Sequence, residues 1–129
     1  MAQENLDLIR AGFAAHNSGD LDALTALYDA GAVFETLSSG THRGREGLRA
    51  IYAQNQEALS GYSVEPIELI ESSDQVVAVA EIKGEGPGSA AAAAGDTFAF
   101  LFTIDRGRIV REQAFPGRQE ALAAAGPQD

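Results

Sequence analysis

A hairpin that we predict over residues 96–116 constrains the fold more than any other stretch of the chain. Its first strand carries apolar side chains at every second position: Phe98, Phe100, Phe102 and Ile104. Alternate residues of a strand point to the same face of a sheet, so the three phenyl rings share one face. Rings of that size indicate a buried sheet surface, with either helices or a ligand cavity against it. After a turn at residues 105–107 the return strand keeps the alternation, and we expect it to continue this surface.

The rest of the chain divides into segments of helical and of strand periodicity. Apolar residues at helical spacing predict three helices ahead of the hairpin, at residues 4–17, 21–28 and 45–59. Alternating residues predict three further strands, at 32–37, 62–71 and 75–83. Gly19 and Asp20 are suited to end the first helix and to cap the second. Pro66 lacks a backbone N–H, which indicates an edge position or a bulge. We interpret residues 84–95 as a connection and 117–125 as a short, frayed helical tail.

This order of elements, with helices early and antiparallel strands late, predicts an α+β domain. The helices should cover one side of a curved sheet and leave an enclosed space at one end. No repeat or linker divides the 129 residues. We therefore expect one domain over residues 1–129, which is long enough to bury a core.

Composition argues against several classes of function. The chain carries 19 acidic and 9 basic side chains, for a net charge of −10, and such a surface repels phosphate backbones and anionic lipids. We therefore expect neither nucleic acid nor a membrane as a partner. Because the sequence has no cysteine, it has no disulfide, thiolate nucleophile or thiolate-bound metal. It shows neither a signal-peptide pattern nor an apolar run of the ~18 residues that a membrane helix needs, so we expect a cytoplasmic protein.

Three stretches of the sequence carry a family resemblance: HNSGDLDAL at residues 16–24, GTHRGREG at 40–47, and the last strand and tail at 107–126. They resemble the SnoaL-like proteins of the nuclear transport factor two-like superfamily. The resemblance implies a cone-shaped, cystatin-like fold, in which three N-terminal helices pack on a curved, mixed and mainly antiparallel sheet that encloses a pocket. It also implies a homodimer formed through the sheet. It implies no single activity, because this scaffold hosts isomerases, cyclases, dehydratases and epoxide hydrolases.

Ketosteroid isomerase is the relative in this superfamily whose chemistry is clearest. It uses an aspartate base on the first strand and an oxyanion hole made of a tyrosine and a protonated aspartate. By this resemblance the tyrosine position falls on Gly12, the base position on Thr36 and the protonated acid near Phe100. All three chemical groups are absent, so steroid isomerisation by that mechanism is not expected.

Glu112 is the first candidate for chemistry. If Val110 and Ala114 face inward on the return strand, alternation places Glu112 inward between them, near the phenylalanine rings. A carboxylate there would lose hydration, and its raised pKa would suit a general base. Alternatively, a bulge or the opposite phase turns Glu112 to solvent, where it pairs with a neighbouring arginine. Charged side chains are rarely buried without a partner, and both orientations stay open.

The remaining candidates line the predicted pocket. Thr36 is the second catalytic candidate, because its hydroxyl can hold a ligand oxygen or a water, although it cannot replace a carboxylate base. Glu35 should face away from the pocket unless the strand slips by one residue. We also predict that a set of residues on the helices and strands contacts the ligand: Phe13, His16, Tyr28, Phe34, Tyr52, Asn55, Phe98, Phe100, Phe102 and Ala114. Packing or internal hydrogen bonds would also explain these side chains.

No metal or cofactor is expected. His16 and His42 lie far apart in the sequence, with no third ligand at a metal-binding spacing. The glycines at residues 84–88 follow a predicted strand but open no amphipathic helix, so they do not form a phosphate-binding or dinucleotide-binding motif.

These features predict a protein that binds a small, largely apolar molecule in the cone cavity. One alternative is a cyclase, isomerase or hydrolase that uses Glu112, or Glu35, as its general base, with Tyr52 or Thr36 as a hydrogen-bonding partner. A second alternative is a purely structural dimeric module whose rings fill the interior.

Overall fold

The computed structural model describes residues 2–36, 40–58, 60–85 and 97–125. Four helices and six strands follow one another in the order α1 (Ala2–Ser18), α2 (Leu21–Ala26), β1 (Tyr28–Glu35), β2 (Thr41–Arg43), α3 (Gly44–Ala58), β3 (Ser60–Ser72), β4 (Gln75–Glu85), β5 (Thr97–Asp105), β6 (Arg108–Phe115) and α4 (Arg118–Ala125). None of the described helices has the length and apolar character to cross a membrane.

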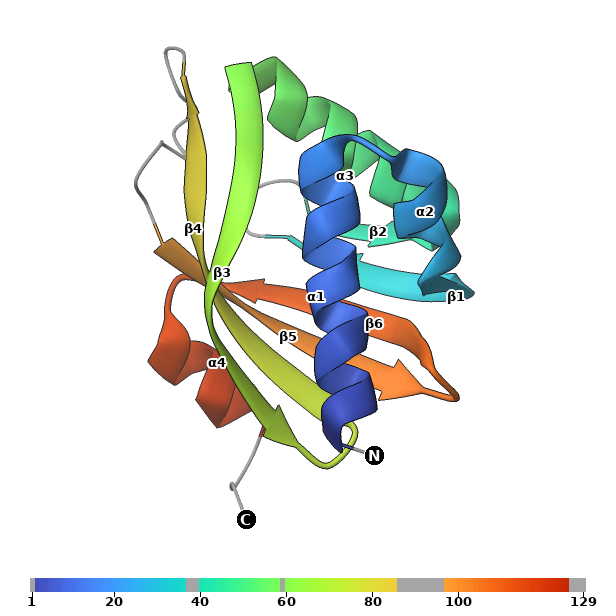
Figure 1. The fold of residues 1–129 in the computed structure, drawn as a ribbon, viewed down its shortest axis with the longest axis vertical. Coiled ribbons are helices and arrows are strands. Elements are labelled where there is room, and N and C mark those ends of the chain that lie inside the picture. The colour runs from blue at the N-terminus through green and yellow to red at the C-terminus, as the bar shows by residue number, and fades with distance from the viewer. Residues whose placement is uncertain (1, 37–39, 59, 86–96, 126–129) are drawn as a thin grey trace.

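The strands form one mixed sheet in the order β2-β1-β6-β5-β4-β3. Only the pair β1 and β6 is parallel; the other neighbours are antiparallel. α1 lies across the sheet, α2 and α3 lie beside the C-terminal half of α1, and α4 lies apart from them near the C-terminus (Figure 1). This is the predicted α+β arrangement of three N-terminal helices on a mainly antiparallel sheet.

The inner face of the sheet, defined here as the face toward α1, carries the phenylalanine rings. Phe102 is 5% exposed and belongs with Ile9 of α1 to the main hydrophobic core. Phe13 of α1 meets two of the rings edge-on, with centroids 6.4 Å from Phe100 and 6.1 Å from Phe102. Phe98 packs against a smaller cluster farther along the sheet. The prediction that the three rings face the interior is therefore confirmed.

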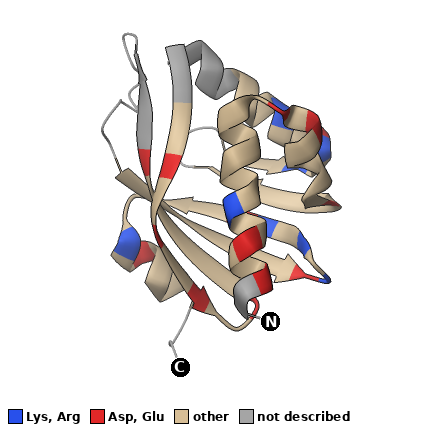
Figure 2. Ribbon diagram, viewed as in Figure 1, with Lys and Arg blue, Asp and Glu red and all other residues tan. Residues whose placement is uncertain are grey.

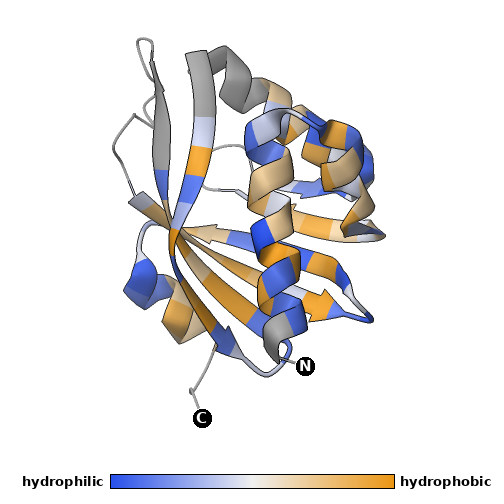
Figure 3. Cartoon of the chain, viewed as in Figure 1, coloured by the Kyte–Doolittle hydropathy of each residue, from blue (hydrophilic) through white to orange (hydrophobic). Residues whose placement is uncertain are grey.

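The outer face carries a second apolar layer. Leu101 and Ala99 of β5 are 1% and 0% exposed and pack with Val77 of β4 against Ala121 of α4. The tail that we expected to be frayed is therefore a packed helix, because its alanine face lies on apolar strand residues. In Figure 3 the central strands are mainly orange, and in Figure 2 the charged residues lie chiefly on helices and toward strand ends.

Two local predictions hold. Gly19 has a φ of 80° and follows α1, and the Asp20 side chain accepts a hydrogen bond from the Ala23 backbone N–H at 3.1 Å. Gly19 therefore adopts the left-handed conformation open to glycine, and Asp20 caps α2. Pro66 lies on the edge strand β3, where the register shifts between Pro66 and Glu68, so both an edge position and a bulge are present.

Other boundaries differ from the prediction. Tyr28 begins β1 instead of ending the second helix, because its backbone enters the parallel pairing with β6 opposite Ile109. Residues 41–43, which lie between the predicted strand 32–37 and the predicted helix 45–59, form the edge strand β2 against β1. Residues 86–96 of the expected connection lie outside the described residues.

Candidate functional site

The candidate site centres on Glu112, which faces the interior from β6. A bulge sets this orientation: Ile109 pairs with Ile104 of β5, and the next pair along β6 skips Val110. Beyond the bulge Glu112 is the cross-strand neighbour of Phe102, so it shares the inner face with the phenylalanine rings. Ile109, which is 1% exposed, enters the core. Glu112 faces the same side of the sheet as Ile109, because the bulge at Val110 shifts the alternation of side chains by one residue.

The Tyr28 hydroxyl donates a hydrogen bond to Oε1 of Glu112 at 2.5 Å. Tyr28 is 5% exposed, so this contact joins a buried ring at the start of β1 to a half-buried carboxylate on β6. The arginine beside Glu112 makes a different contact. Arg111 donates through Nε, 2.8 Å away, to the Glu35 carboxylate, on the outer face. Glu112 therefore does not take the alternative orientation in which it pairs with an arginine in solvent.

Aromatic side chains surround this carboxylate. Phe34 of β1, Glu112 and Phe102 of β5 form a row across three neighbouring strands. The Tyr28 and Phe34 ring centroids are 5.1 Å apart, and those of Phe100 and Phe102 are 6.2 Å apart. Glu112 therefore lies in a band of rings that continues from β1 to Phe100, a surrounding of low polarity.

This environment changes the acidity of both polar partners. Burial raises the pKa of Glu112 from its ordinary value of 4.5 to about 7, although the Tyr28 hydrogen bond opposes the rise. Burial, the negative charge of Glu112 and the hydrogen bond raise the pKa of Tyr28 well above its ordinary value. Tyr28 therefore remains a proton donor near neutral pH, while Glu112 can exchange its proton there.

The second oxygen of Glu112 has no hydrogen-bond partner among the described residues. Oε1 accepts the Tyr28 bond, and no other hydrogen bond or ion pair of the described residues reaches the carboxylate. Every fully buried side-chain nitrogen or oxygen in the described part of the chain has a hydrogen-bond partner. Since Oε2 has none among the described residues, it is not fully buried and keeps some accessible surface.

A second group of candidates lies between α1 and α3. The rings of His16 and Tyr52 are in edge-on contact, with centroids 5.1 Å apart, and both side chains are half-buried. Burial lowers the pKa of His16, against the opposing effect of its hydrogen bond with Asn17, so the neutral imidazole is favoured near pH 7. The side chain of Asn55, farther along α3, lies outside the described residues.

The remaining candidate residues do not contact Tyr28 and Glu112 through any hydrogen bond or ion pair of the described residues. The Thr36 hydroxyl donates to the Gly40 carbonyl oxygen at 2.9 Å, so this hydroxyl is engaged with the backbone at the edge of the sheet. Glu35 lies on the outer face with Arg111. Phe98, Phe100 and Ala114 are half-buried, and Ala114 pairs with Phe100 on the inner face.

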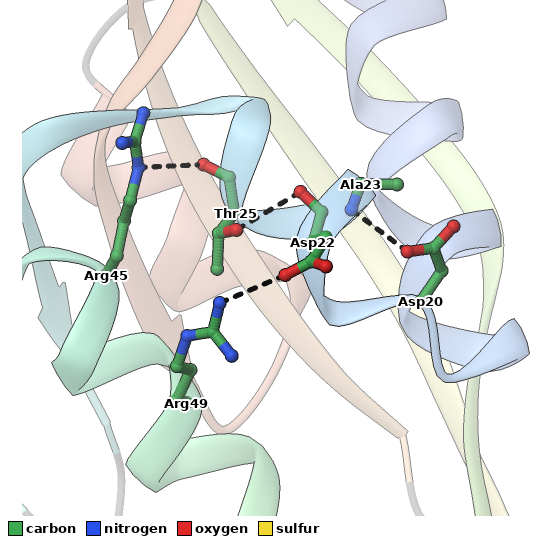
Figure 4. Close-up of polar contacts among 6 residues, drawn as sticks. All are labelled: Asp20, Asp22, Ala23, Thr25, Arg45 and Arg49. Atoms are coloured by element: carbon green, nitrogen blue, oxygen red, sulfur yellow. Dashed lines mark hydrogen bonds and ion pairs between the residues drawn. The ribbon is translucent and has the colours of Figure 1, made fainter.

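α3 holds the segment that leads into Tyr28. The Arg45 Nε donates to the Thr25 carbonyl oxygen at 3.3 Å, and Arg49 pairs with Asp22 at 3.2 Å (Figure 4). Arg45 also reaches the Tyr28 carbonyl oxygen at 3.5 Å. These contacts join both ends of α2 to α3 and so help to position the start of β1.

Sequence reasoning missed two polar contacts. The partner of the Tyr28 hydroxyl lies 84 residues away, and no local pattern connects the two. Asn17 makes two hydrogen bonds of 2.8 Å with the Val64 backbone, one to its carbonyl oxygen and one from its N–H. A polar residue at the end of an amphipathic helix was the only available signal for this second contact.

The described residues contain no set of three or more histidine, aspartate or glutamate side chains placed to hold a metal ion. A surface depression between the start of α1 and the β5–β6 turn is lined by polar and apolar residues that include none of the candidates: Glu4, Asn5, Asp7, Leu8, Ile104, Arg106 and Gly107.

The comparisons with known proteins decide the family. The model of the SnoaL-like domain matches residues 9–112. This chain belongs to the SnoaL-like family. No match was found among curated proteins.

Solved structures resemble this SnoaL-like domain along most of its length. A putative polyketide cyclase from Sinorhizobium meliloti is 30% identical, with a TM-score of 0.72 over 84% of this chain and 93% of that one. Bal32a, from a soil-derived mobile gene cassette, is 26% identical, with a TM-score of 0.77 over 88% of each chain. A nuclear transport factor two-like protein from Burkholderia pseudomallei is 17% identical, with a TM-score of 0.77 over 96% of this chain and 98% of that one, and shows the fold alone.

Proposed function

We propose that this SnoaL-like domain binds a small, largely apolar molecule between α1, α3 and the inner face of the sheet. The observation that carries the proposal is the partial exposure of side chains that point toward the helices. Phe13, Phe98, Phe100 and Ala114 all lie on this side of the sheet or on α1, yet they are half-buried and not fully buried. A solid core would leave such residues without exposed surface, whereas an accessible hollow lined by rings is typical of a ligand site.

Substitution of Ala114 separates a hollow from a filled core. In a hollow, the ring of Ala114→Phe occupies free space, so the free energy of unfolding should change by less than about 1 kcal/mol. In a filled core, the added ring would cost about 1–3 kcal/mol or more. Ala99→Phe is the matched control, because Ala99 is 0% exposed under α4, and it should be destabilising in either case. Equal destabilisation of the two variants would contradict the proposed cavity.

Ligand binding itself is tested by thermal stability. Steroids, polyketides and terpenoids should be screened, since a ligand present at about 100 times its Kd stabilises the folded state by about 2.7 kcal/mol. A hit should be lost in Ala114→Phe if it occupies the proposed site. A hit that the variant retains would place the binding elsewhere.

A second candidate function, proton transfer, is favoured by the Tyr28–Glu112 pair. Above its pKa of about 7, Glu112 can accept a proton from a ligand carbon or a water through Oε2, while Tyr28 holds Oε1 in place. This chemistry suits a cyclase, isomerase or hydrolase, and the similar structure from Sinorhizobium meliloti is described as a putative polyketide cyclase. Once turnover is found, Glu112→Gln should lower kcat by about 100-fold or more. Full activity in that variant would exclude Glu112 as the base.

The remaining proposals concern location and assembly. We propose that the domain acts in the cytoplasm as a homodimer formed through the sheet. Its net charge of −10 continues to argue against nucleic acid and anionic membranes as partners. If Ala114→Phe shows a filled core, the domain is better explained as a structural dimeric module.

A further inference from the structure

Glu112 combines an accessible negative charge with aromatic neighbours. Its cross-strand neighbours are Phe34 and Phe102, and Phe100 is the diagonal neighbour on β5. The ring of Phe13 contacts Phe100 and Phe102 from α1. Phe34 and Phe102 are 1% and 5% exposed and keep the surroundings apolar. Phe13 and Phe100 are half-buried, so their rings remain within reach of a ligand.

Within the described part of the chain, the Glu112 carboxylate has no counter-ion of its own. The basic residue next to it, Arg111, pairs with Glu35 on the outer face. Arg45 and Arg49 of α3 contact α2 and the first residue of β1. Within the described residues, the Tyr28 hydroxyl is the only group that stabilises the charge of Glu112 by hydrogen bonding. An ionised carboxylate in surroundings of low polarity is costly until an opposite charge joins it.

We propose that the ligand of this site is an apolar amine or quaternary ammonium compound, whose cationic group pairs with Glu112 and lies against the rings of Phe13 and Phe100. The inference rests on the proposed function, since the ligand must enter the hollow on the inner face. It adds the chemical class of the ligand.

The chemistry of the site favours a cation over other apolar molecules. An anion would meet the charge of Glu112 inside a protein of net charge −10. A neutral molecule without a donor would remove water from Oε2 and leave it without a partner, which weakens binding. An ammonium group supplies the missing positive charge, and its alkyl groups can lie on ring faces, where the quadrupole attracts a cation.

Three other titratable groups face this interior. His16 of α1 and Tyr52 of α3 are in ring contact with each other, and His42 of β2 is the cross-strand neighbour of Phe34 on the inner face. Protonation of a histidine in this interior at low pH would also repel a cation, so a loss of affinity on acidification does not by itself point to Glu112. Only the effect that depends on Glu112 supports the inference.

The experiment compares a cation with its uncharged carbon isostere. Phenyltrimethylammonium and tert-butylbenzene have the same shape, and the quaternary nitrogen cannot lose a proton. Their Kd values would be measured by calorimetry or by competition at pH 8.5 and pH 5.5. We expect the cation to bind at least about 10-fold more tightly at pH 8.5. With a pKa of about 7 for Glu112, about 3% of the carboxyl would be ionised at pH 5.5, so the cation should lose up to about 30-fold in affinity while the hydrocarbon is unchanged.

Two variants identify the origin of the preference. Glu112→Gln keeps the size of the side chain and should abolish both the cation preference and its dependence on pH, while it still binds tert-butylbenzene. Glu35→Gln removes the same charge from the opposite face of the sheet and should retain both. A dependence on pH that persists in Glu112→Gln would assign it to another titratable group of the interior and overturn the inference.

The outcomes separate this inference from the proposed function. Equal binding of both probes at pH 8.5 overturns the ammonium ligand but supports an apolar site. Binding of neither probe at millimolar concentration counts against the hollow and the inference together. If Glu112→Gln does not fold, the comparison of the two probes and two pH values in the unmodified protein still decides the question.

Discussion

Glu112→Gln should remove a dependence of stability on pH that the unmodified protein shows. The pKa of Glu112 is about 7 in the folded protein, against an ordinary value of 4.5. Between these values the folded state binds more protons than the unfolded state, so the free energy of unfolding falls as pH rises. The difference of about 2.5 pH units corresponds to about 3 kcal/mol, since one unit equals about 1.4 kcal/mol. The full penalty is present above about pH 7 and is absent below about pH 4.5.

The assay is urea denaturation of both proteins at pH 5, 6, 7 and 8. The glutamine can still accept the hydrogen bond from Tyr28 and cannot ionise, so the variant should become more stable relative to the unmodified protein by about 2–3 kcal/mol between pH 5 and pH 8. Glu35→Gln provides the baseline, because it breaks an ion pair in which both side chains are more than a third exposed and which should contribute about 0.2–1 kcal/mol.

Parallel stability curves for the unmodified protein and Glu112→Gln would refute this reasoning. They would mean that the Glu112 carboxylate is hydrated in the folded state as it is in the unfolded chain. Direct titration of the carboxyl carbon by NMR would then give a pKa near 4.5. Both the proton-transfer candidate and the proposed ammonium ligand would lose their physical basis.

Three further measurements test other parts of the structure. Tyr28→Phe removes the hydrogen bond that lowers the pKa of Glu112, so the pKa measured by NMR should rise further, by about 1 unit for a charge-assisted bond of about 1.5 kcal/mol; an unchanged pKa would contradict the contact. Asn17→Ala removes two hydrogen bonds with the Val64 backbone and should cost about 2 kcal/mol in urea denaturation, whereas Ser18→Ala, which removes an exposed bond, should cost less than about 1 kcal/mol. Light scattering should give twice the chain mass of 13.5 kDa for the proposed homodimer, and a mass of one chain would exclude it.

The elements with one apolar face were predictable from the sequence. The row of rings on β5 and the apolar stripe of α1 repeat at the spacing of their backbone conformations, because burial on one side selects every second or every third to fourth residue. Gly19 and Asp20 were predictable for a different reason. Their effects depend on the local backbone, through a left-handed φ and an N-cap hydrogen bond.

The assignment of Tyr28 to a helix was wrong because a distant contact outweighs the local pattern. Leu21 and Leu24 start a helical stripe that continues through Tyr28, but the Ile109 backbone N–H donates to the Leu27 carbonyl oxygen at 3.0 Å. This bond belongs to the parallel pairing of β1 with β6, and no sequence pattern near Tyr28 predicts that pairing.

The orientation of Glu112 was left open for a similar reason. Alternation alone could not decide it, because the bulge at Val110 changes the phase along β6 and its position depends on the register with β5. The separation of the two acids is likewise a property of the sheet. Glu35 and Glu112 lie on opposite faces, which leaves Arg111 paired with Glu35 and leaves Glu112 facing the rings.

The charge of Glu112 is the feature that the fold itself does not require. The buried Tyr28 hydroxyl needs an acceptor, and Oε1 provides one. A glutamine at the same position would provide an equivalent oxygen without the ionisation cost of about 3 kcal/mol that follows from the raised pKa. Hydrogen bonding to Tyr28 therefore explains a polar side chain at position 112 but not an acidic one. A negative charge there suits the proposed roles of pairing with a bound cation or accepting a proton, and Oε2 is the atom through which either would act.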